Sequence, residues 1–406
     1  MRLPRLSWRR DDLAKTLAAF VLTSACSSVS QATGNQQVGP NLESSDGHRA
    51  CASSPVWWIT GKVLLEPGCI FTSTVNITDS HTELNCQGSV IDPGSLSGYA
   101  LHINSQGRRL TNITVRNCIV RNTNAIGIVV GWRGSDQAKV SRYDRDEIYE
   151  RTPHFVQIIN TRVEASKGAG IYIDDYVSDV TLRHVAVTRS DSMAIYLEHS
   201  SRRITIEDSL FEDNSMVKKR EALAIDSSAH NVIRRNIFRR NKAGGIFLYK
   251  NCHEHAAFDA RQTERWQGSD NNLIEDNYFE DEPVGVWIGS RQSLDLRKLR
   301  CGDPYYGGKF VRDKARENTV RSNSFLRVAK GVLIEDDENA VVGNRFQTTQ
   351  EVCIRVGSAP RSTLLGLPVI GIDVKDNECD LGVDVKSRQK AVSVGIEFVH
   401  GSSASR

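Results

Sequence analysis

A repeat of roughly two dozen residues constrains this chain more than any other feature of its sequence. The phrase Asn-x-Phe occurs four times, at Asn236–Phe238, Asn277–Phe279, Asn323–Phe325 and Asn344–Phe346. Looser versions of the phrase end at Val120, Val163, Val187 and Phe211. Between the last residues of successive phrases, from 120 to 346, the intervals are 43, 24, 24, 27, 41, 46 and 21 residues. The sequence therefore predicts one repeating unit, with about twenty extra residues inserted in three of the units.

Each repeat contains two short strand patterns separated by polar turn residues, as in Ala194–His199 followed by Ile204–Phe211. No convincing amphipathic helix lies between the strands, so helical crossover connections are not expected. Short strands at this spacing coil into a solenoid in which each turn stacks on the last as parallel strands. Asparagines at a turn fit such a coil, because their amides can hydrogen-bond the next turn's asparagine and backbone.

The pattern resembles the right-handed parallel β-helix of pectate-lyase-like proteins over residues 75–395. The resemblance implies an all-β solenoid with loop insertions that wall one face. Residues 27–74 are then expected to form an N-terminal linker and cap, and residues 396–406 a C-terminal tail. The same architecture serves lyases, hydrolases, epimerases and non-catalytic proteins, so it gives no activity by itself.

When the first strand of each turn is aligned on its buried positions, polar and aromatic residues fall into outward columns. The buried positions are Ile171/Ile173, Ile195/Leu197, Leu223/Ile225, Ile246/Leu248, Val286/Ile288 and Val332/Ile334. One outward column contains Tyr172, Tyr196, Ala224, Phe247, Trp287 and Leu333. The next contains Asp174, Glu198, Asp226, Tyr249, Gly289 and Glu335. Beyond it come Asp175, His199, Ser227 and Lys250, and then Tyr176, Asn251 and Arg291.

Three carboxylates, those of Asp174, Glu198 and Asp226, are consecutive in this alignment. Strands lie about 4.8 Å apart, so stacked carboxylates repel one another and call for a cation, a shared proton or nearby basic groups. Aromatic rings beside acids suit sugars, whose apolar faces stack on rings while their hydroxyls bind carboxylates. These columns predict a carbohydrate site; the alternative is a solvated polar face, which is common on solenoids.

Three long insertions leave directly after this strand and are expected to wall a groove over the carboxylates. They span Gly131–His154, Cys252–Asp270 and Gln292–Glu317. His253, in the second insertion, is a candidate sugar contact. Cys252 and Cys301 lie in two neighbouring insertions, where a disulfide could tie the walls together.

Within the β-helix resemblance, we favour a lyase that cleaves an acidic, uronate-containing polysaccharide by β-elimination. Such lyases hold calcium with acidic residues and use a Lys or Arg as the base. The resemblance then implies that Asp174, Glu198 and Asp226 hold Ca²⁺ through their carboxylate oxygens. Lys250 would be the base, and Arg291 would bind a uronate carboxylate or assist departure of the leaving group. The expected substrate contacts are Tyr172, Asp175, Tyr196, His199, Phe247, Tyr249, Asn251, His253 and Trp287.

Two other interpretations stay open at this point. A glycoside hydrolase could pair two of the carboxylates, because adjacent and alternate turns give separations near the retaining and inverting ranges. The protein could also bind polysaccharide without catalysis, or resemble the β-helical copper-site maturation factors. A copper role has little support in a chain with three Met and no His-rich tract.

The first 26 residues predict an export signal. A positive segment with Arg2, Arg5, Arg9 and Arg10 precedes a short apolar run, Thr16–Ala25. The run ends in Thr-Ser-Ala-Cys, which resembles a bacterial lipoprotein box with Cys26 as a possible lipid anchor, and Ser-Trp-Arg-Arg resembles a twin-arginine signal. We therefore expect a periplasmic, outer-membrane-anchored or secreted protein. Beyond this segment no apolar run of about 18 residues predicts a membrane span.

The charge of the chain bears on its partners, and the number of cysteines bears on disulfide formation. Removing residues 1–25 takes five of 52 Lys and Arg and two of 49 Asp and Glu, which leaves 47 of each. The balanced charge argues against a nucleic-acid partner. Eight cysteines remain once Cys26 is set aside, and an even number in an oxidising compartment predicts disulfides. We expect a monomer.

Overall fold

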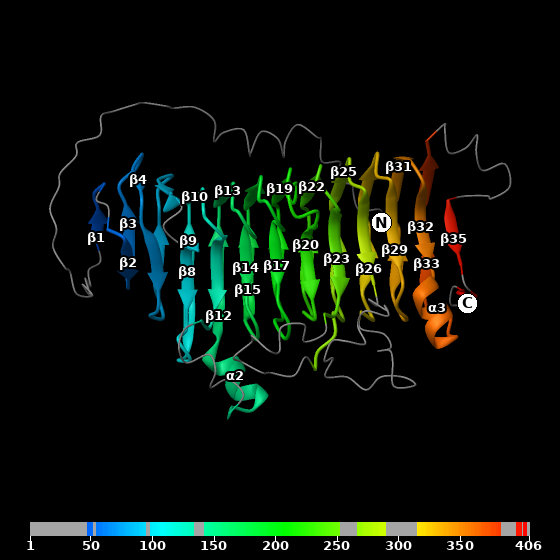
Figure 1. Cartoon of the computed structure of the whole chain (residues 1–406), viewed down its shortest axis with the longest axis horizontal. Coiled ribbons are helices and arrows are strands. Elements are labelled where there is room, and N and C mark those ends of the chain that lie inside the picture. The colour runs from blue at the N-terminus through cyan, green and yellow to red at the C-terminus, as the bar shows by residue number, and fades with distance from the viewer. Residues whose placement is uncertain are drawn as a thin grey trace, which may run out of the picture. The chain divides into compact units, whose positions relative to one another are not determined.

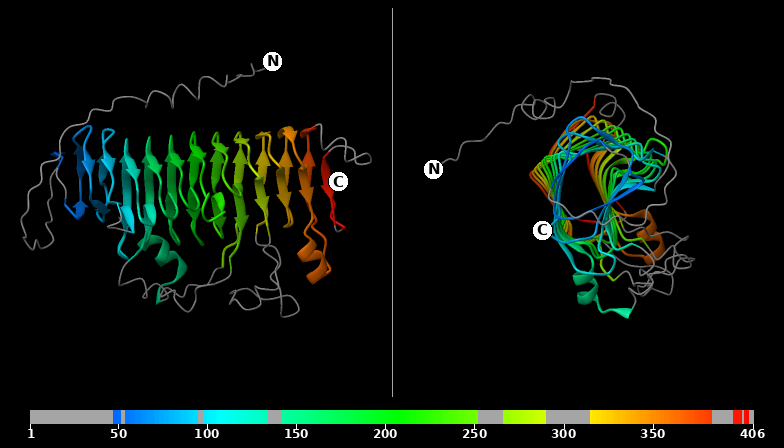
Figure 2. Two further views of the ribbon diagram at one scale, coloured as in Figure 1. Left: turned by 45° about the horizontal axis from the view of Figure 1, so that its top comes forward. Right: turned by 90° about the vertical axis from the view of Figure 1, so that its left-hand side faces the viewer.

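The described part of the chain winds into one coil, and its strands form three parallel sheets that run along the coil. The computed structural model describes residues 47–51, 54–94, 98–133, 142–251, 266–289, 315–382, 395–399 and 401–403. All of them fall within one compact unit, Leu42–Arg406. The strands of successive turns lie side by side (Figure 1), and the end-on view in Figure 2 shows the sheets surrounding a common core. The solenoid predicted from the repeat is confirmed.

We call the three sheets A, B and C. Each complete turn adds one strand to each sheet, first to sheet B, then to sheet A and then to sheet C. Sheet A contains β1 (Gly47–Arg49), β3 (Lys62–Leu65), β6 (Glu83–Asn85), β9 (Leu110–Arg116), β12 (Pro153–Ile159), β15 (Ser178–Arg183), β18 (Thr205–Glu207), β21 (Val232–Arg234), β24 (Leu273–Glu275), β27 (Thr319–Arg321), β30 (Ala340–Val342) and β33 (Asp373–Lys375). Sheet B contains β2 (Val56–Ile59), β5 (Thr74–Ile77), β8 (Tyr99–Asn104), β11 (Ile126–Gly131), β14 (Ile171–Ile173), β17 (Ile195–Leu197), β20 (Glu221–Asp226), β23 (Gly244–Tyr249), β26 (Val284–Ile288), β29 (Lys330–Ile334), β32 (Val352–Val356) and β35 (Ile396–Phe398). Sheet C contains β4 (Ile70–Phe71), β7 (Val90–Ile91), β10 (Ile119–Arg121), β13 (Arg162–Glu164), β16 (Ala186–Thr188), β19 (Leu210–Glu212), β22 (Ile237–Arg239), β25 (Tyr278–Glu280), β28 (Ser324–Leu326), β31 (Arg345–Thr349) and β34 (Glu378–Leu381).

The coil extends beyond the expected limits of 75 and 395. At one end β1 to β4 already pair within the three sheets, and at the other β35 pairs with β32. Two short helices, α2 (Arg145–Arg151) and α3 (Ala359–Leu365), follow strands of sheet B and were not expected from the sequence. Asp144 and Ser358 cap their N termini by accepting hydrogen bonds from backbone N–H groups three residues on. The described residues include no helix that is long and apolar enough to cross a membrane.

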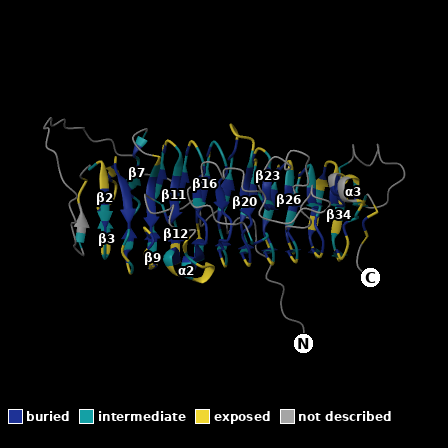
Figure 3. Cartoon of the chain, turned by 60° about the horizontal axis from the view of Figure 1, so that its bottom comes forward, coloured by how far each residue is buried: buried dark blue, intermediate teal, exposed yellow. Residues whose placement is uncertain are grey.

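The buried positions of sheet B stack as the sequence alignment predicted. Hydrogen-bonded register carries Ile173 onto Leu197 and then onto Ile225, and continues to Ile334. The whole predicted column is buried, and its members are Ile173, Leu197, Ile225, Leu248, Ile288 and Ile334. Figure 3 shows the same pattern along the coil, with buried residues on the strands and exposed residues at turns and on α2. The apolar interior runs the length of the coil and stabilises every turn against its neighbours.

The phenylalanines of the repeat stack on one another inside the coil. Phe279 lies between Phe238 and Phe325, with ring centroids 5.0 and 4.7 Å away and nearly parallel planes. The stack forces a close approach at the start of the following sheet B strand. A Cβ added to Gly245 would meet the Phe279 ring at 2.6 Å, and one added to Gly285 would meet the Phe325 ring at 2.4 Å. Glycine therefore recurs after the phenylalanines because no side chain fits there.

The asparagines of the repeat form a hydrogen-bonded ladder beside the phenylalanines. The Asn236 amide donates to Asn277 Oδ1 at 3.0 Å, and the Asn277 amide donates to Asn323 Oδ1 at 3.0 Å. Backbone N–H groups of the same residues donate to the same oxygens. The ladder continues through Asn344 to Asn377. Each buried amide is satisfied by the next turn, as predicted, and the phrase Asn-x-Phe fixes the register of successive turns.

A shorter ladder ends in a glutamate. Asn214 donates to Asn241 Oδ1 at 3.1 Å, and the Asn241 amide donates to Glu282 Oε1 at 2.6 Å. Burial raises the pKa of the Glu282 carboxyl to about 8, although the hydrogen bonds from Asn241 oppose the rise. The folded chain therefore binds this proton more tightly than an unfolded carboxyl of pKa 4.5 does. The resulting loss of stability sets in as pH rises from about 4.5 to about 8.

Replacing this carboxyl by a neutral amide should remove that loss. Glutamine keeps the oxygen that Asn241 requires and carries no charge, so we expect Glu282→Gln to be more stable than the wild type by about 2–4 kcal/mol at pH 9. At pH 4.5 the gain should nearly vanish. Urea titrations at the two pH values measure both differences. Glu351→Gln, at an exposed glutamate, serves as the control. Equal differences at both pH values for Glu282→Gln would contradict the expectation.

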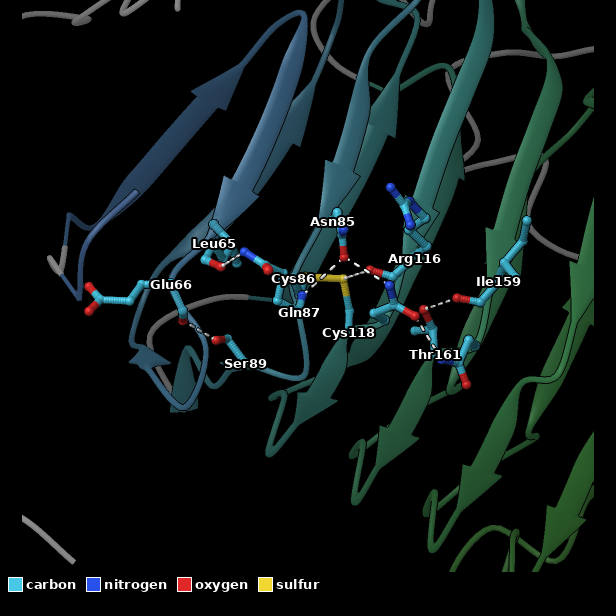
Figure 4. The surroundings of a disulfide bond; sticks show 12 residues. Leu65, Glu66, Asn85, Cys86, Gln87, Ser89, Arg116, Cys118, Ile159 and Thr161 are labelled. Carbon is cyan, nitrogen blue, oxygen red and sulfur yellow. Dashed lines mark hydrogen bonds between the residues drawn. A yellow bond between two sulfur atoms is a disulfide. The ribbon is translucent and has the colours of Figure 1, made fainter. Parts of the chain in front are cut away.

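Disulfides join turns near both ends of the coil. Cys51 is bonded to Cys69, Cys86 to Cys118, and Cys353 to Cys379. The Cys86–Cys118 bond links the turn after β6 with the turn after β9, and Asn85 lies beside it (Figure 4). Asn85 accepts a hydrogen bond from the Asn117 amide. Disulfide formation is thus confirmed for these cysteines. Cys252 and Cys301 lie outside the described residues, so a bond between them stays a prediction.

Candidate functional site

Four aromatic side chains form a column on the outer face of sheet B. Register pairs Tyr172 with Tyr196 and Phe247 with Trp287, and Ala224 occupies the turn between the pairs. The rings of Tyr172 and Tyr196 stack with centroids 5.3 Å apart, and those of Phe247 and Trp287 meet edge to face at 5.4 Å. The predicted alignment of outward positions is therefore correct. We call Tyr172, Tyr196, Phe247 and Trp287 the aromatic column.

The three predicted acids lie at the carboxyl ends of β14, β17 and β20. Asp174, Glu198 and Asp226 are 1%, 7% and 0% exposed, so they do not form a solvated face. Hydroxyls of the aromatic column bind two of these acids. Tyr172 donates to Glu198 Oε2 at 2.5 Å, and Tyr196 donates to Asp226 Oδ2 at 2.6 Å. Each hydroxyl comes from the turn before the carboxylate that it contacts, and this donation offsets the repulsion between stacked acids.

Both tyrosines are held in their protonated form. Burial raises the pKa of Tyr172 and of Tyr196 well above the ordinary value, and the negative charges of Glu198 and Asp226 raise it further. At neutral pH the two hydroxyls are therefore hydrogen-bond donors. They cannot act as anionic bases in this arrangement.

Asp226 accepts hydrogen bonds from three different residues. Besides Tyr196, it accepts from the Asn251 backbone N–H at 2.8 Å and from the Asn251 amide at 2.6 Å. The Ser227 hydroxyl donates to its second oxygen at 3.1 Å. The structure thus brings two predicted site residues, Asn251 and Asp226, into direct contact across one turn of the coil.

Asp174 binds an arginine from the start of the first insertion. Arg133 Nε lies 3.0 Å from Asp174 Oδ2, and the guanidinium lies over the Tyr172 ring at 4.9 Å from its centroid. Asn104 fixes the arginine backbone, accepting from its N–H at 3.0 Å and donating to its carbonyl at 2.8 Å. A basic group therefore borders the aromatic column at the end nearer the N terminus.

His199 and Asp175 form a buried pair next to the carboxylates. His199 Nε2 lies 3.0 Å from Asp175 Oδ2, and its Nδ1 lies 3.3 Å from the Ser200 hydroxyl oxygen. The backbone N–H of His199 donates to Glu198 Oε1 at 3.0 Å. Asp175 orients the imidazole, and the pair ties the third outward column to the second.

Helix α2 packs against the edge of this site. Tyr149 donates its hydroxyl to the Ser200 carbonyl at 2.6 Å, and the Arg202 guanidinium covers the Tyr149 ring at 3.6 Å. Thr152, which follows the helix, donates to the Tyr176 carbonyl at 2.8 Å. In Figure 1 the helix projects beyond the edge where the sheet B strands end. The described part of the first insertion thus borders the site, as predicted, while most of the other two insertions lies outside the described residues.

Tyr249 is aligned with the three acids, but its hydroxyl binds groups at the other end of the strands. Its hydroxyl donates to Glu221 Oε1 at 2.5 Å and accepts from Arg220 at 2.7 Å, both at the other end of the β20 strand. Lys250 follows directly and is 5% exposed. The predicted base therefore lies in a buried position one turn beyond Asp226, which pairs in register with Tyr249.

Glu335 lies in the same outward column as Asp174, Glu198 and Asp226, but it was not among the predicted site residues. It follows β29, and the Trp287 side chain hydrogen-bonds it. Burial raises the pKa of Glu335 to about 7, while the Trp287 contact and the charge of Arg355 oppose the rise. The column thus ends in a carboxyl that changes protonation near neutral pH. Its position in the alignment was the sequence signal that could have identified it.

Calcium binding and the catalytic and substrate-binding roles of the site residues stay predictions. Arg291 and His253 lie outside the described residues. Within the described ranges, one group of three or more His, Cys, Asp or Glu has ligand atoms within 4.8 Å of one another, namely Cys51, Glu66 and Cys69. The carboxylates of Asp174, Glu198 and Asp226 do not converge in this way. A shared Ca²⁺ would require them to exchange their present donors for the ion.

Two family matches cover most of the coil. Residues 99–261 match the family described as right handed beta helix region, and residues 255–391 match periplasmic copper-binding protein (NosD). The first match, together with the three parallel sheets, identifies the fold as a right-handed parallel β-helix. The second family's name concerns copper, yet the metal-ligand group of the described residues lies at 51–69, and its two cysteines form a disulfide. Comparison with curated proteins gives no match.

Several solved structures share the fold. The catalytic unit of a thermostable GH87 alpha-1,3-glucanase from Streptomyces thermodiastaticus is 10% identical, with a TM-score of 0.52 over 89% of this chain and 63% of that one. DFA-IIIase from Arthrobacter chlorophenolicus A6 is 13% identical, with a TM-score of 0.51 over 84% and 82%. The mannuronan C-5 epimerase AlgE6 A-module from Azotobacter vinelandii is 14% identical, with a TM-score of 0.49 over 80% and 76%. At these identities the likeness concerns the fold.

Proposed function

We propose that this right-handed parallel β-helix protein is an exported polysaccharide-active enzyme whose substrate lies along the aromatic column of sheet B. The observation that carries the proposal is the register of four aromatic rings with three buried acids on consecutive turns. From β14 to β26 the column spans four strand steps, or about 19 Å. That length accommodates several sugar units of one chain. The three described disulfides support an oxidising compartment.

The chemistry of the column fits a sugar polymer. The half-buried rings of Tyr172, Phe247 and Trp287 offer apolar surface to a sugar, while the tyrosine hydroxyls and carboxylates beside them offer hydrogen-bond partners for sugar hydroxyls. Arg133, over the Tyr172 ring, adds a cation that suits a uronate carboxylate. The catalytic unit of an alpha-1,3-glucanase has a similar fold, which supports a polysaccharide as the substrate class.

For the reaction we favour β-elimination on a uronate-containing chain. Lys250, as the neutral amine, takes the proton from the carbon next to the uronate carboxylate. The electron pair left behind forms a carbon–carbon double bond, the bond to the glycosidic oxygen breaks, and the departing oxygen takes a proton from the Lys250 ammonium. In our proposal Arg291 binds the carboxylate of the reacting uronate, whereas Arg133, four strand steps from Lys250, binds a uronate further along the same chain. Asp226 holds Tyr196 and Asn251 in position.

Hydrolysis is the second candidate, because Glu198 and Asp226 end strands that pair directly. Paired strands lie about 4.8 Å apart, near the carboxylate separation of retaining glycosidases. In that mechanism one acid would protonate the glycosidic oxygen and the other would attack the sugar. The tyrosine hydroxyls now bound to both acids would have to give way to substrate.

One experiment distinguishes these activities from simple binding. The protein is incubated with a panel of uronic and neutral polysaccharides, and the absorbance of unsaturated products is followed separately from new reducing ends. β-Elimination gives both signals on uronic polymers only. Hydrolysis gives reducing ends without the absorbance. Neither signal on any polymer would overturn the proposed enzymatic function.

A further inference from the structure

One turn between sheets C and B is longer than its neighbours, and it lies at the candidate site. From Phe211 of β19 to Leu223 of β20 the chain advances 12 residues, since 223 − 211 = 12. The paired positions one turn earlier, 187 and 195, differ by 8, and those one turn later, 238 and 246, also differ by 8. Four extra residues therefore enter the coil directly before the strand that ends in Asp226.

The extra residues are held in place by the turn before them. The Ser215 N–H donates to the Ser190 carbonyl at 2.8 Å, and its hydroxyl donates to the Ser192 carbonyl at 2.7 Å. The Lys218 N–H donates to the Asp191 carbonyl at 2.8 Å. These bonds hold the backbone of the turn at the edge of sheet B.

The tip of this turn is both exposed and basic. Met216 and Val217 are 54% and 63% exposed, and Lys218 and Lys219 are also exposed. Several arginines at other turns differ, because they are paired with acids of an adjacent turn, as Arg240 is with Asp213 at 2.9 Å. Among the described residues neither Lys218 nor Lys219 has an ion pair. Two cations are thus directed to solvent without a partner in this part of the chain.

The base of the turn is connected to the aromatic column. Arg220 donates to the Tyr249 hydroxyl at 2.7 Å and to Glu221 Oε1 at 3.0 Å. Tyr249 packs in one cluster with Tyr196 and contacts Trp287 at 6.2 Å between ring centroids. The basic tip therefore stands beside the middle of the column, at the end of the strands opposite to the insertions that follow Gly131, Tyr249 and Ile288.

We propose that residues 216–220, here called the basic turn, border the aromatic column at the end of the strands opposite to the insertions and select anionic polysaccharides by binding their carboxylate or sulfate groups. Met216 and Val217 would contact the apolar edge of the sugar chain, and Lys218 and Lys219 would attract its charges. This inference rests on the proposed function, since it deepens the choice of substrate at the same site. Exposed lysines attract through screened Coulomb forces, so the selection weakens as salt rises.

The test compares Lys218→Ala/Lys219→Ala with the wild type by affinity electrophoresis in gels containing alginate, a uronate polymer, or dextran, a neutral one. At low salt we expect the double variant to bind alginate about 5- to 20-fold more weakly than the wild type does. The difference should shrink at 0.5 M salt, and retardation by dextran should be unchanged. Lys62→Ala/Lys375→Ala removes the same charge from exposed positions on sheet A and should behave like the wild type.

Equal retardation of the double variant and the wild type in alginate would overturn this inference, and so would a wild type that alginate does not retard. An equal loss in the Lys62→Ala/Lys375→Ala control would also overturn it, because net charge alone would then explain binding. Failure of the proposed function looks different. In that case the wild type is retarded by alginate, the double variant is retarded less, and no polysaccharide is cleaved.

Discussion

Lys250→Ala is expected to lose turnover by about 10²- to 10⁴-fold while binding polysaccharide nearly as well as the wild type. Proton abstraction occurs in the transition state, so removal of the base lowers kcat and leaves ground-state contacts in place. Trp287→Ala should do the reverse, raising KM first because it removes a stacking surface. Initial rates and affinity electrophoresis on the same polymer measure both quantities.

Controls separate catalysis from folding at this position. Lys250 is buried, so Lys250→Met preserves most of the side-chain volume and should fold when Lys250→Ala does not. The exposed Lys375→Ala should keep full activity. A fully active Lys250→Met protein would contradict the proposal that Lys250 is the base in β-elimination. Partial loss there, with complete loss in Glu198→Gln or Asp226→Asn, would favour hydrolysis.

Phe279→Ala is expected to lower the free energy of unfolding by about 3–5 kcal/mol. The ring is fully buried, lies between Phe238 and Phe325, and fills the space that Gly245 leaves open. Removing it leaves a cavity that the neighbouring turns cannot close without breaking the asparagine ladder. Equilibrium unfolding in guanidinium chloride gives the difference. Phe155→Ala, at a phenylalanine that is 55% exposed, should change stability by less than about 0.5 kcal/mol. Equal effects of the two substitutions would contradict the stacked core.

The coil could be predicted from the sequence because its constraints are periodic. The inside and outside of a strand alternate every residue, so placing Ile171 and Ile173 inside also places Tyr172 outside. The phrase Asn-x-Phe marks the same corner of successive turns, which fixed the alignment of Tyr196 with Phe247 and Trp287. The first turns, β1 to β4, contain no such phrase. The sequence prediction therefore placed the start of the coil too late.

The contacts within the site could not be predicted in the same way. The alignment places Tyr172 and Glu198 on adjacent turns, but the hydroxyl reaches the acid only because the ring leans along the coil. Repulsion between the acids was predicted, and Lys250 and Arg291 were expected to offset it. The structure shows that Tyr172, Tyr196, Asn251 and Arg133 also donate to these acids, which the alignment did not predict. A repeat indicates whether a side chain points inward or outward, but not which rotamer it adopts.

The sequence located the insertions correctly, but it did not predict the helix within the first of them. Nothing periodic marks Arg145–Arg151 as a helix, although Asp144 and the acids after it form a local capping signal. The basic turn was missed because four residues barely alter a spacing of two dozen. It stands out only when paired strands fix the expected length of the turn.

A crystal structure of Lys250→Ala with an oligosaccharide of the polymer that the wild type cleaves tests the central claim most directly. The variant should hold the uncleaved chain. Our account predicts sugar rings stacked along Tyr172, Tyr196, Phe247 and Trp287, with the scissile bond beside Asp226 and Asn251. An oligosaccharide bound on sheet A or sheet C, with the aromatic column uncovered, would contradict it.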